Sequence, residues 1–70
     1  MIEYKIEKNG YGQDCAVTII GQNISIPFAP SNTDYENFKY RINNEEATLE
    51  TADGVVMSAA EAKAYVATLP

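Results

Sequence analysis

Apolar and charged side chains alternate strictly along residues 2–8, IEYKIEK, as expected for a strand that is buried on one face. Two glycines bracket a tyrosine in the turn-forming residues 9–14, and the β-branched run at 15–21 predicts a central strand. Alternation resumes at residues 24–28. Because Pro27 has no backbone N–H, we expect this third strand to lie at a sheet edge or to end at the proline. The first part of the chain therefore predicts a three-stranded antiparallel meander.

A helix is predicted after the third strand. Pro30 cannot continue a strand ladder, and the next four residues, SNTD at 31–34, offer an N-cap in several registers. Thr33 and Glu36 have the spacing of a capping box. The helical period ends at the asparagine pair 43–44. The apolar stripe that should face the sheet consists of Tyr35, Phe38 and Ile42.

A hairpin and a second helix are predicted in the last third of the chain. Residues 47–51 alternate weakly, an Asp-Gly pair follows at 53–54, and apolar residues resume at 55–57. Asp-Gly between two apolar runs is a strong hairpin signal. Ser58 and Glu61 then have the spacing of a capping box, which predicts that a helix begins there.

Together these elements predict an α+β fold. Their order is βββαββα: a small antiparallel sheet, made of the three-stranded N-terminal meander and a C-terminal hairpin, with two helices on one of its faces. Seventy residues suffice for one hydrophobic core and not for two, and 46% of them are hydrophobic, as in folded proteins. We therefore expect residues 1–70 to form a single domain.

The last helix, AAEAKAYVATL at residues 59–69, has two apolar faces. The face that should pack on the sheet consists of Ala59, Ala62, Tyr65, Val66 and Leu69. The second face consists of Ala60, Ala64 and Ala67. A helix with so little polar surface is usually covered on more than one side, which favours self-association or partner docking through the second face. Alanine at exposed positions also agrees with its high helix propensity alone.

Charge is distributed unevenly along the chain. Ten acidic and five basic residues give a net charge of −5, whereas binding to a phosphate backbone needs a concentration of Lys and Arg. Nucleic acid is therefore not an expected partner. Residues 43–62, the acidic region, contain no base, and are either a solvated face or a face that steers a basic partner. The acids of this region are Glu45, Glu46, Glu50, Asp53 and Glu61.

The chain lacks the residue types that most catalytic sites need. It has no histidine, which removes Ser–His and Cys–His nucleophile pairs and histidine-bound metals. Its single cysteine, Cys15, is expected to be a small buried strand residue without a disulfide partner. No stretch is apolar enough for a membrane span or a secretion signal. We expect a non-enzyme without cofactor or metal, whose partners are proteins and not nucleic acid or membrane.

Five tyrosines stand out in a chain that has no tryptophan. Three of them, Tyr4, Tyr35 and Tyr65, lie on predicted core stripes. Tyr11 lies between two glycines at a loop tip, and Tyr40 lies on the helix face opposite the core stripe. Exposed tyrosines are frequent interface anchors, so these two are candidates for partner contact together with Ala60, Ala64 and Ala67.

Residues Ile26–Phe38, IPFAPSNTDYENF, resemble a pattern of small tailed-bacteriophage proteins, including virion and tail accessory proteins. The pattern reads Ile-Pro, a short spacer, Pro-x-Asn-x-Asp-Tyr, and an aromatic or aliphatic residue three positions later. The resemblance implies a protein made in the cytoplasm of a host cell and located in the virion. It favours a non-enzymatic structural role, as a decoration, connector or tail accessory subunit that docks to its own copies or to other virion proteins.

Two alternative functions remain open. One is a monomeric phage effector that binds and inhibits a host protein, with the acidic region 43–62 as its recognition surface. Its binding to a basic host protein would then weaken steeply as salt is added. The other is a small cellular binding domain.

Overall fold

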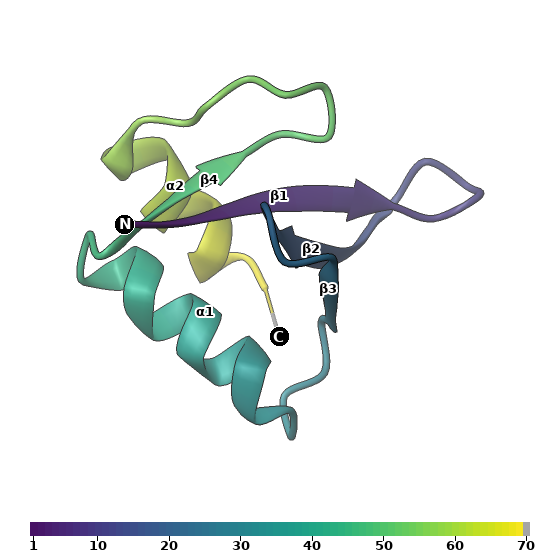
Figure 1. The fold of residues 1–70 in the computed structure, drawn as a ribbon, viewed down its shortest axis with the longest axis horizontal. Coiled ribbons are helices and arrows are strands. Elements are labelled where there is room, and N and C mark those ends of the chain that lie inside the picture. The colour runs from purple at the N-terminus through teal and green to yellow at the C-terminus, as the bar shows by residue number, and fades with distance from the viewer. Residues whose placement is uncertain (70) are drawn as a thin grey trace.

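The computed structural model describes residues 1–69, in which a mixed four-stranded sheet is combined with two helices (Figure 1). In chain order the elements are β1 (Ile2–Lys8), β2 (Asp14–Ile19), β3 (Ile24–Pro27), α1 (Thr33–Asn43), β4 (Ala47–Glu50) and α2 (Ala59–Ala67). The strands are arranged in the order β3-β2-β1-β4, with β1 antiparallel to β2 and β2 antiparallel to β3. The predicted α+β class, the two helices and the N-terminal meander are therefore confirmed.

β3 lies at an edge of the sheet and ends at Pro27, as predicted. The Phe28 N–H donates to the Cys15 carbonyl at 3.2 Å. In an antiparallel pair the backbone groups of successive residues point alternately to the partner strand and away from it, so those of Ser25 and Pro27 point to the free edge. Proline offers no donor there. This edge is therefore poorly suited to pairing with a further strand.

β4 departs from the prediction. The wholly antiparallel sheet is wrong, because β4 lies beside β1 and runs parallel to it, with Tyr4 opposite Leu49. The cause is the connection: α1 carries the chain from the end of β3 back to the end of the sheet where β1 begins. A strand that starts there runs in the same direction as β1.

The predicted C-terminal hairpin forms only in part, because backbone hydrogen bonds pair residues 49–51 with residues 55–57 without making a fifth strand among the described residues. Gly54 adopts a φ of 89°, which the Asp-Gly signal anticipates, but Val56 makes just an isolated bridge to Glu50. Ser58 caps α2 two residues further on, so residues 55–57 are too few to form a strand after the turn. Helix initiation therefore limits the hairpin.

Side-chain caps begin both helices. Asn32 is the N-cap of α1, and its side-chain oxygen accepts a hydrogen bond from the Tyr35 N–H at 3.1 Å. The predicted capping box of Thr33 and Glu36 is wrong, because Thr33 is already the first residue of the helix. The capping box predicted for α2 is confirmed, with both bonds between Ser58 and Glu61 at 3.2 Å.

The core lies between one face of the sheet and both helices. Tyr4 meets Phe38 edge to face, with ring centroids 4.9 Å apart, and Phe28 packs 5.6 Å from Tyr35. The buried cluster consists of Tyr4, Ile6, Val17, Ile26, Tyr35, Phe38, Ile42, Leu49, Ala62 and Val66. Segment 26–38 thus ends a strand, caps a helix and supplies core aromatics.

Cys15 is exposed, contrary to the expectation of a buried strand residue. The pairing of β1 with β2 places Glu7 opposite Ala16 and Lys8 opposite Asp14. Cys15 is therefore the extra residue of a β-bulge, where the regular alternation of inward and outward side chains is lost.

Candidate docking surfaces

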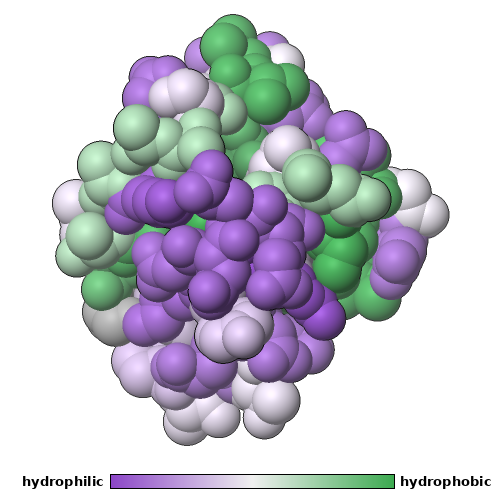
Figure 2. Space-filling view, turned by 90° about the vertical axis from the view of Figure 1, so that its left-hand side faces the viewer, coloured by the Kyte–Doolittle hydropathy of each residue, from purple (hydrophilic) through white to green (hydrophobic). Residues whose placement is uncertain are grey.

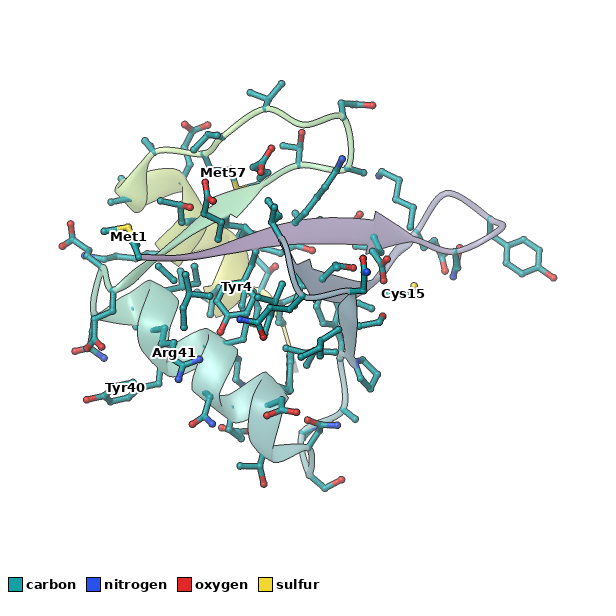
Figure 3. All side chains as sticks on the ribbon, viewed as in Figure 1. Met1, Tyr4, Cys15, Tyr40, Arg41 and Met57 are labelled. Carbon is teal, nitrogen blue, oxygen red and sulfur yellow. The ribbon has the colours of Figure 1, made fainter. Side chains whose placement is uncertain are left out.

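The structure separates the two tyrosines that the sequence proposes as contacts. Tyr11 lies at the tip of the β1–β2 loop and is 90% exposed, and Tyr40 on α1 is 62% exposed. The β1–β2 loop projects from one end of the molecule in Figure 1, and Tyr40 lies toward the other end in Figure 3. The two side chains do not belong to one continuous patch.

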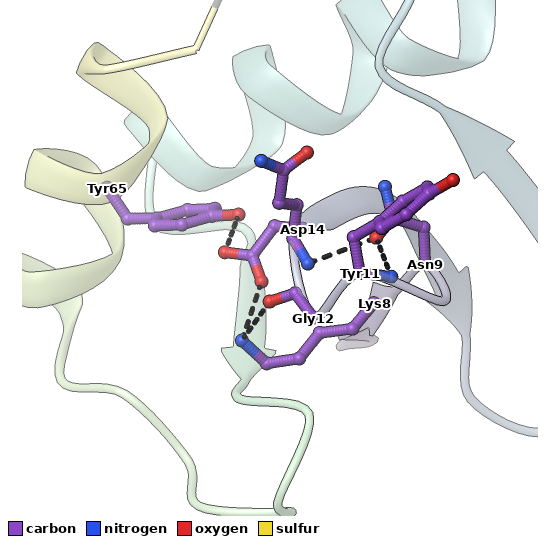
Figure 4. A network of polar contacts seen from close by, with 7 residues as sticks. Lys8, Asn9, Tyr11, Gly12, Asp14 and Tyr65 are labelled. Atoms are coloured by element: carbon purple, nitrogen blue, oxygen red, sulfur yellow. Dashed lines mark hydrogen bonds and ion pairs between the residues drawn. The ribbon is translucent and has the colours of Figure 1, made fainter.

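Hydrogen bonds order the loop that carries Tyr11 (Figure 4). The Asn9 side-chain oxygen accepts from the Tyr11 N–H at 2.8 Å and from the Gln13 N–H at 3.1 Å. The Asn9 N–H donates to the Gln13 carbonyl at 2.8 Å, and the Gly12 N–H donates to the Asn9 carbonyl at 3.0 Å. An asparagine that bonds to the backbone ahead of it is a common way to fix a turn. Tyr11 is therefore presented on an ordered tip.

A side-chain network attaches α2 to the base of this hairpin (Figure 4). The Tyr65 hydroxyl donates to Asp14 Oδ2 at 2.9 Å, and Lys8 Nζ lies 3.2 Å from Asp14 Oδ1. Burial and then the hydrogen bond to Asp14 raise the pKa of Tyr65, because both disfavour the phenolate. The sequence prediction placed Tyr65 on the core stripe and missed this contact, because Tyr65 and Asp14 are far apart in the chain.

α2 turns one face to the core. On this face Ala62 and Val66 are each 4% exposed, while Tyr65 and Leu69 are half-buried. Ala59, predicted to face the core, is exposed at the first turn of the helix. The second predicted face is exposed along the helix, and it forms the alanine face of Ala60, Ala64 and Ala67.

An apolar groove lies beside residues 57–59, where the β4–α2 loop enters α2, and sequence reasoning missed it. Its volume is ≈ 190 Å³, and the chain's two methionines, Met1 and Met57, both line it. Ala59 also lines this methionine groove, and among the described residues Glu45 is its one charged lining residue. The lining comes from four separate parts of the chain, so no local period or motif could have predicted it.

The fold itself engages part of the acidic region 43–62. Figure 2 shows one face of the molecule, on which hydrophilic residues fill the centre and the lower part and hydrophobic residues lie above them and on both sides. Glu45 in the α1–β4 turn accepts a hydrogen bond from Lys63 Nζ at 2.8 Å, and this contact lowers the pKa of Glu45. The Glu61 carboxylate accepts the Ser58 N–H in the capping box. Two of the five acids therefore have partners within the fold.

The other face of the sheet carries a second hollow, of ≈ 410 Å³, lined by charged groups that include Lys5, Glu7 and Lys8. Two of these have partners, because Glu7 accepts the Ser25 hydroxyl at 2.7 Å and Lys8 contacts Asp14. Within residues 1–69 no three His, Cys, Asp or Glu side chains are grouped so that they could hold a metal ion. Neither described helix has the length and apolar character needed to cross a bilayer.

Comparisons of the chain with protein-family models, with curated proteins and with solved structures find no significant match. The candidate docking surfaces of the protein are therefore the ordered Tyr11 tip, the alanine face and the methionine groove.

Proposed function

We propose that this protein is a non-enzymatic docking subunit of a phage virion, such as a decoration, connector or tail accessory protein. The observation that carries the proposal is the alanine face of α2, which is exposed along the whole helix. Small side chains let a neighbouring backbone approach closely, and alanine loses no rotamer freedom when it is buried. This face suits a contact with another copy of the chain or with another virion protein.

The rest of the fold holds the alanine face in position. The capping box fixes the first turn of α2, and two of its side chains are packed in the core. Lys63 bonds to Glu45 in the turn after α1, and Tyr65 bonds to Asp14 at the hairpin base. A surface that is already ordered loses little conformational entropy on docking.

The phage setting is supported by the resemblance of residues 26–38. In the fold this segment ends β3, supplies the Asn32 cap and buries Tyr35 and Phe38. It is a joint in the fold and not a contact surface. The resemblance therefore supports the setting, while α2 supports the docking role.

The acidic region supports the rival function, an effector that blocks a basic host protein, less well. Glu45 is paired with Lys63, and the Glu61 carboxylate is used in the cap of α2. The acids that remain are Glu46, Glu50 and Asp53. Mimicry of nucleic acid would need carboxylates that are denser and regularly spaced, like phosphates.

Static light scattering over a concentration series up to about 100 µM tests the proposal. We expect wild-type protein to associate and the Ala64→Glu variant to keep the 7.7 kDa mass of a monomer. The introduced carboxylate would be buried at the contact without a partner, which is strongly unfavourable. The control Asn37→Glu adds the same charge at an exposed position of α1 and should associate like wild type.

Circular dichroism must show that both variants remain folded. A wild-type protein that stays monomeric over the whole series would contradict assembly by self-docking. An Ala64→Glu variant that associates like wild type would remove the alanine face from the proposal.

A further inference from the structure

We propose that the protein also makes a head-to-tail contact, in which Tyr11 of one copy enters the methionine groove of the next copy. This inference rests on the proposed docking function and adds a second, weaker contact to the one through α2. It links the ordered tip and the groove, two features that the alanine face does not use.

The tip has the properties of a preformed knob. Tyr11 is 90% exposed, and the loop around it is held by the Asn9 hydrogen bonds and by the ion pair at its base. Tyrosine provides a large contact area at a low cost in side-chain entropy. An exposed aromatic side chain that is carried by an ordered backbone turn is therefore well suited to insertion into a partner.

The methionine groove has the size and lining to accept this side chain. Its volume is ≈ 190 Å³, and an apolar cavity of about 150 Å³ is known to hold a benzene ring. Met1 and Met57 have flexible, polarizable side chains, which adapt to irregular partners and make favourable contacts with aromatic rings. The groove therefore has room for one tyrosine ring.

The polar groups of the two surfaces also match. Glu45 lines the groove, and Lys63 is bonded to its Oε2 atom, which leaves Oε1 to accept the Tyr11 hydroxyl. The tip residues 9–13 carry no charge, and the charged residues at their two ends, Lys8 and Asp14, are paired with each other. No acidic side chain of the tip would therefore face the Glu45 carboxylate.

The positions of knob and groove make the contact heterologous. The hairpin tip projects from one end of the molecule, and Met1 and Met57 lie on the side away from it (Figure 3). A contact between two different surfaces repeats from copy to copy, and it gives a ring or an open filament according to the rotation per step. Each copy adds at most its longest dimension of 30 Å to such an assembly.

A complementation experiment in the Ala64→Glu background tests this contact without the alanine face. Tyr11→Ala removes the knob and leaves the groove, whereas Ala59→Phe fills the groove and leaves the knob. Each double variant alone should stay monomeric in sedimentation equilibrium up to about 1 mM, where the Ala64→Glu protein itself associates. A mixture of the two should form dimers and nothing larger, because one knob and one groove remain.

Two further variants sharpen the result. Tyr11→Phe keeps the ring and loses the hydroxyl, so association should weaken by a few-fold, against about tenfold or more for Tyr11→Ala. Gln13→Ala, in the same loop, should associate like its parent. Raising salt from about 20 mM to about 300 mM should strengthen the contact, because it screens the repulsion between copies of charge −5.

The outcomes separate this contact from the proposed function. If the Ala64→Glu protein remains monomeric at about 1 mM, or if the mixture of variants forms no dimer, the head-to-tail contact is wrong and the test of the alanine face is unaffected. If the mixture dimerises while Ala64→Glu does not change association at lower concentration, the head-to-tail contact stands and the alanine face is wrong. Thermal unfolding of each variant confirms that loss of association is not loss of folding.

Discussion

The two helices contribute to the core to different extents. α1 buries a stripe of large side chains, with Tyr35 and Phe38 0% exposed and Ile42 2% exposed. α2 buries the much smaller Ala62 and Val66, each 4% exposed. Because the free energy gained from burial scales with the apolar area removed from water, α1 should stabilise the fold far more than α2.

The exposed face of α1 is polar, whereas the exposed face of α2 is apolar. α1 directs polar side chains outward, and two of them, Glu36 and Lys39, form an ion pair at 4.0 Å. α2 directs the alanine face outward. A helix that adds little to the core and yet has an apolar outer face has surface available for a partner. We therefore expect folding to depend mainly on α1, while the docking that we propose would use α2.

The largest expected effect comes from the core stripe of α1. Phe38→Ala should lower the free energy of unfolding by about 3–5 kcal/mol, because it leaves a cavity beside the Tyr4 ring. Tyr40→Ala, two residues further along the same helix and 62% exposed, should change it by less than about 0.5 kcal/mol. Urea denaturation of both variants provides the measurement. If both variants lost the same free energy of unfolding, α1 would not be a helix that buries only one of its faces.

A smaller effect is expected from the helix caps, and its form should differ between the helices. Asn32→Ala and Ser58→Ala should each cost about 1 kcal/mol of helix stability. α2 has few buried contacts, so loss of its cap should appear as local fraying. α1 is fixed by the core, so loss of its cap should appear in the stability of the whole domain.

Amide hydrogen exchange distinguishes the two forms. In Ser58→Ala the amides of α2 should exchange faster while those of the sheet keep their rates. In Asn32→Ala all slowly exchanging amides should change together. Ser58→Asp, which retains a capping oxygen, should behave like wild type. Uniform acceleration in Ser58→Ala would mean that α2 unfolds with the core, contrary to the comparison.

Local patterns predicted much of the fold. The strict alternation of residues 2–8 identified β1, Pro27 marked the end of the edge strand, and the spacing of Ser58 and Glu61 identified the start of α2. Each of these signals involves residues within one turn or one strand. A period of two or a cap is set by the local backbone, so it can be recognised without knowledge of the partner.

The larger errors concern contacts between distant segments. The parallel pairing of β4 with β1 depends on where α1 returns the chain, and the Asp-Gly turn cannot show that a helix begins too soon for a strand. The hydrogen bond from Tyr65 to Asp14 and the lining of the methionine groove likewise join segments that have no common period. The two glycines beside Tyr11 predicted that this side chain is exposed, but no local signal predicted the position of the methionine groove.

The smallest expected effect concerns the ion pair that joins α2 to the turn after α1. The hydrogen bond and charge of Lys63 lower the pKa of Glu45, so the pair stabilises the fold above the ordinary pKa of a glutamate. That contribution is lost as the pH falls through the lowered pKa in the folded state. Both groups are largely exposed, so the change in Tm should be a few degrees at most.

Thermal unfolding of wild type and Glu45→Gln between about pH 7 and pH 3 measures this contribution. Wild type should be the more stable protein at neutral pH, and the difference should vanish toward the acidic end and in about 1 M salt. Glu46→Gln, which removes the adjacent charge and leaves the Lys63 pair intact, should not show this pH dependence. A difference between wild type and Glu45→Gln that is the same at all pH values would mean that the ion pair does not tie α2 to the turn after α1.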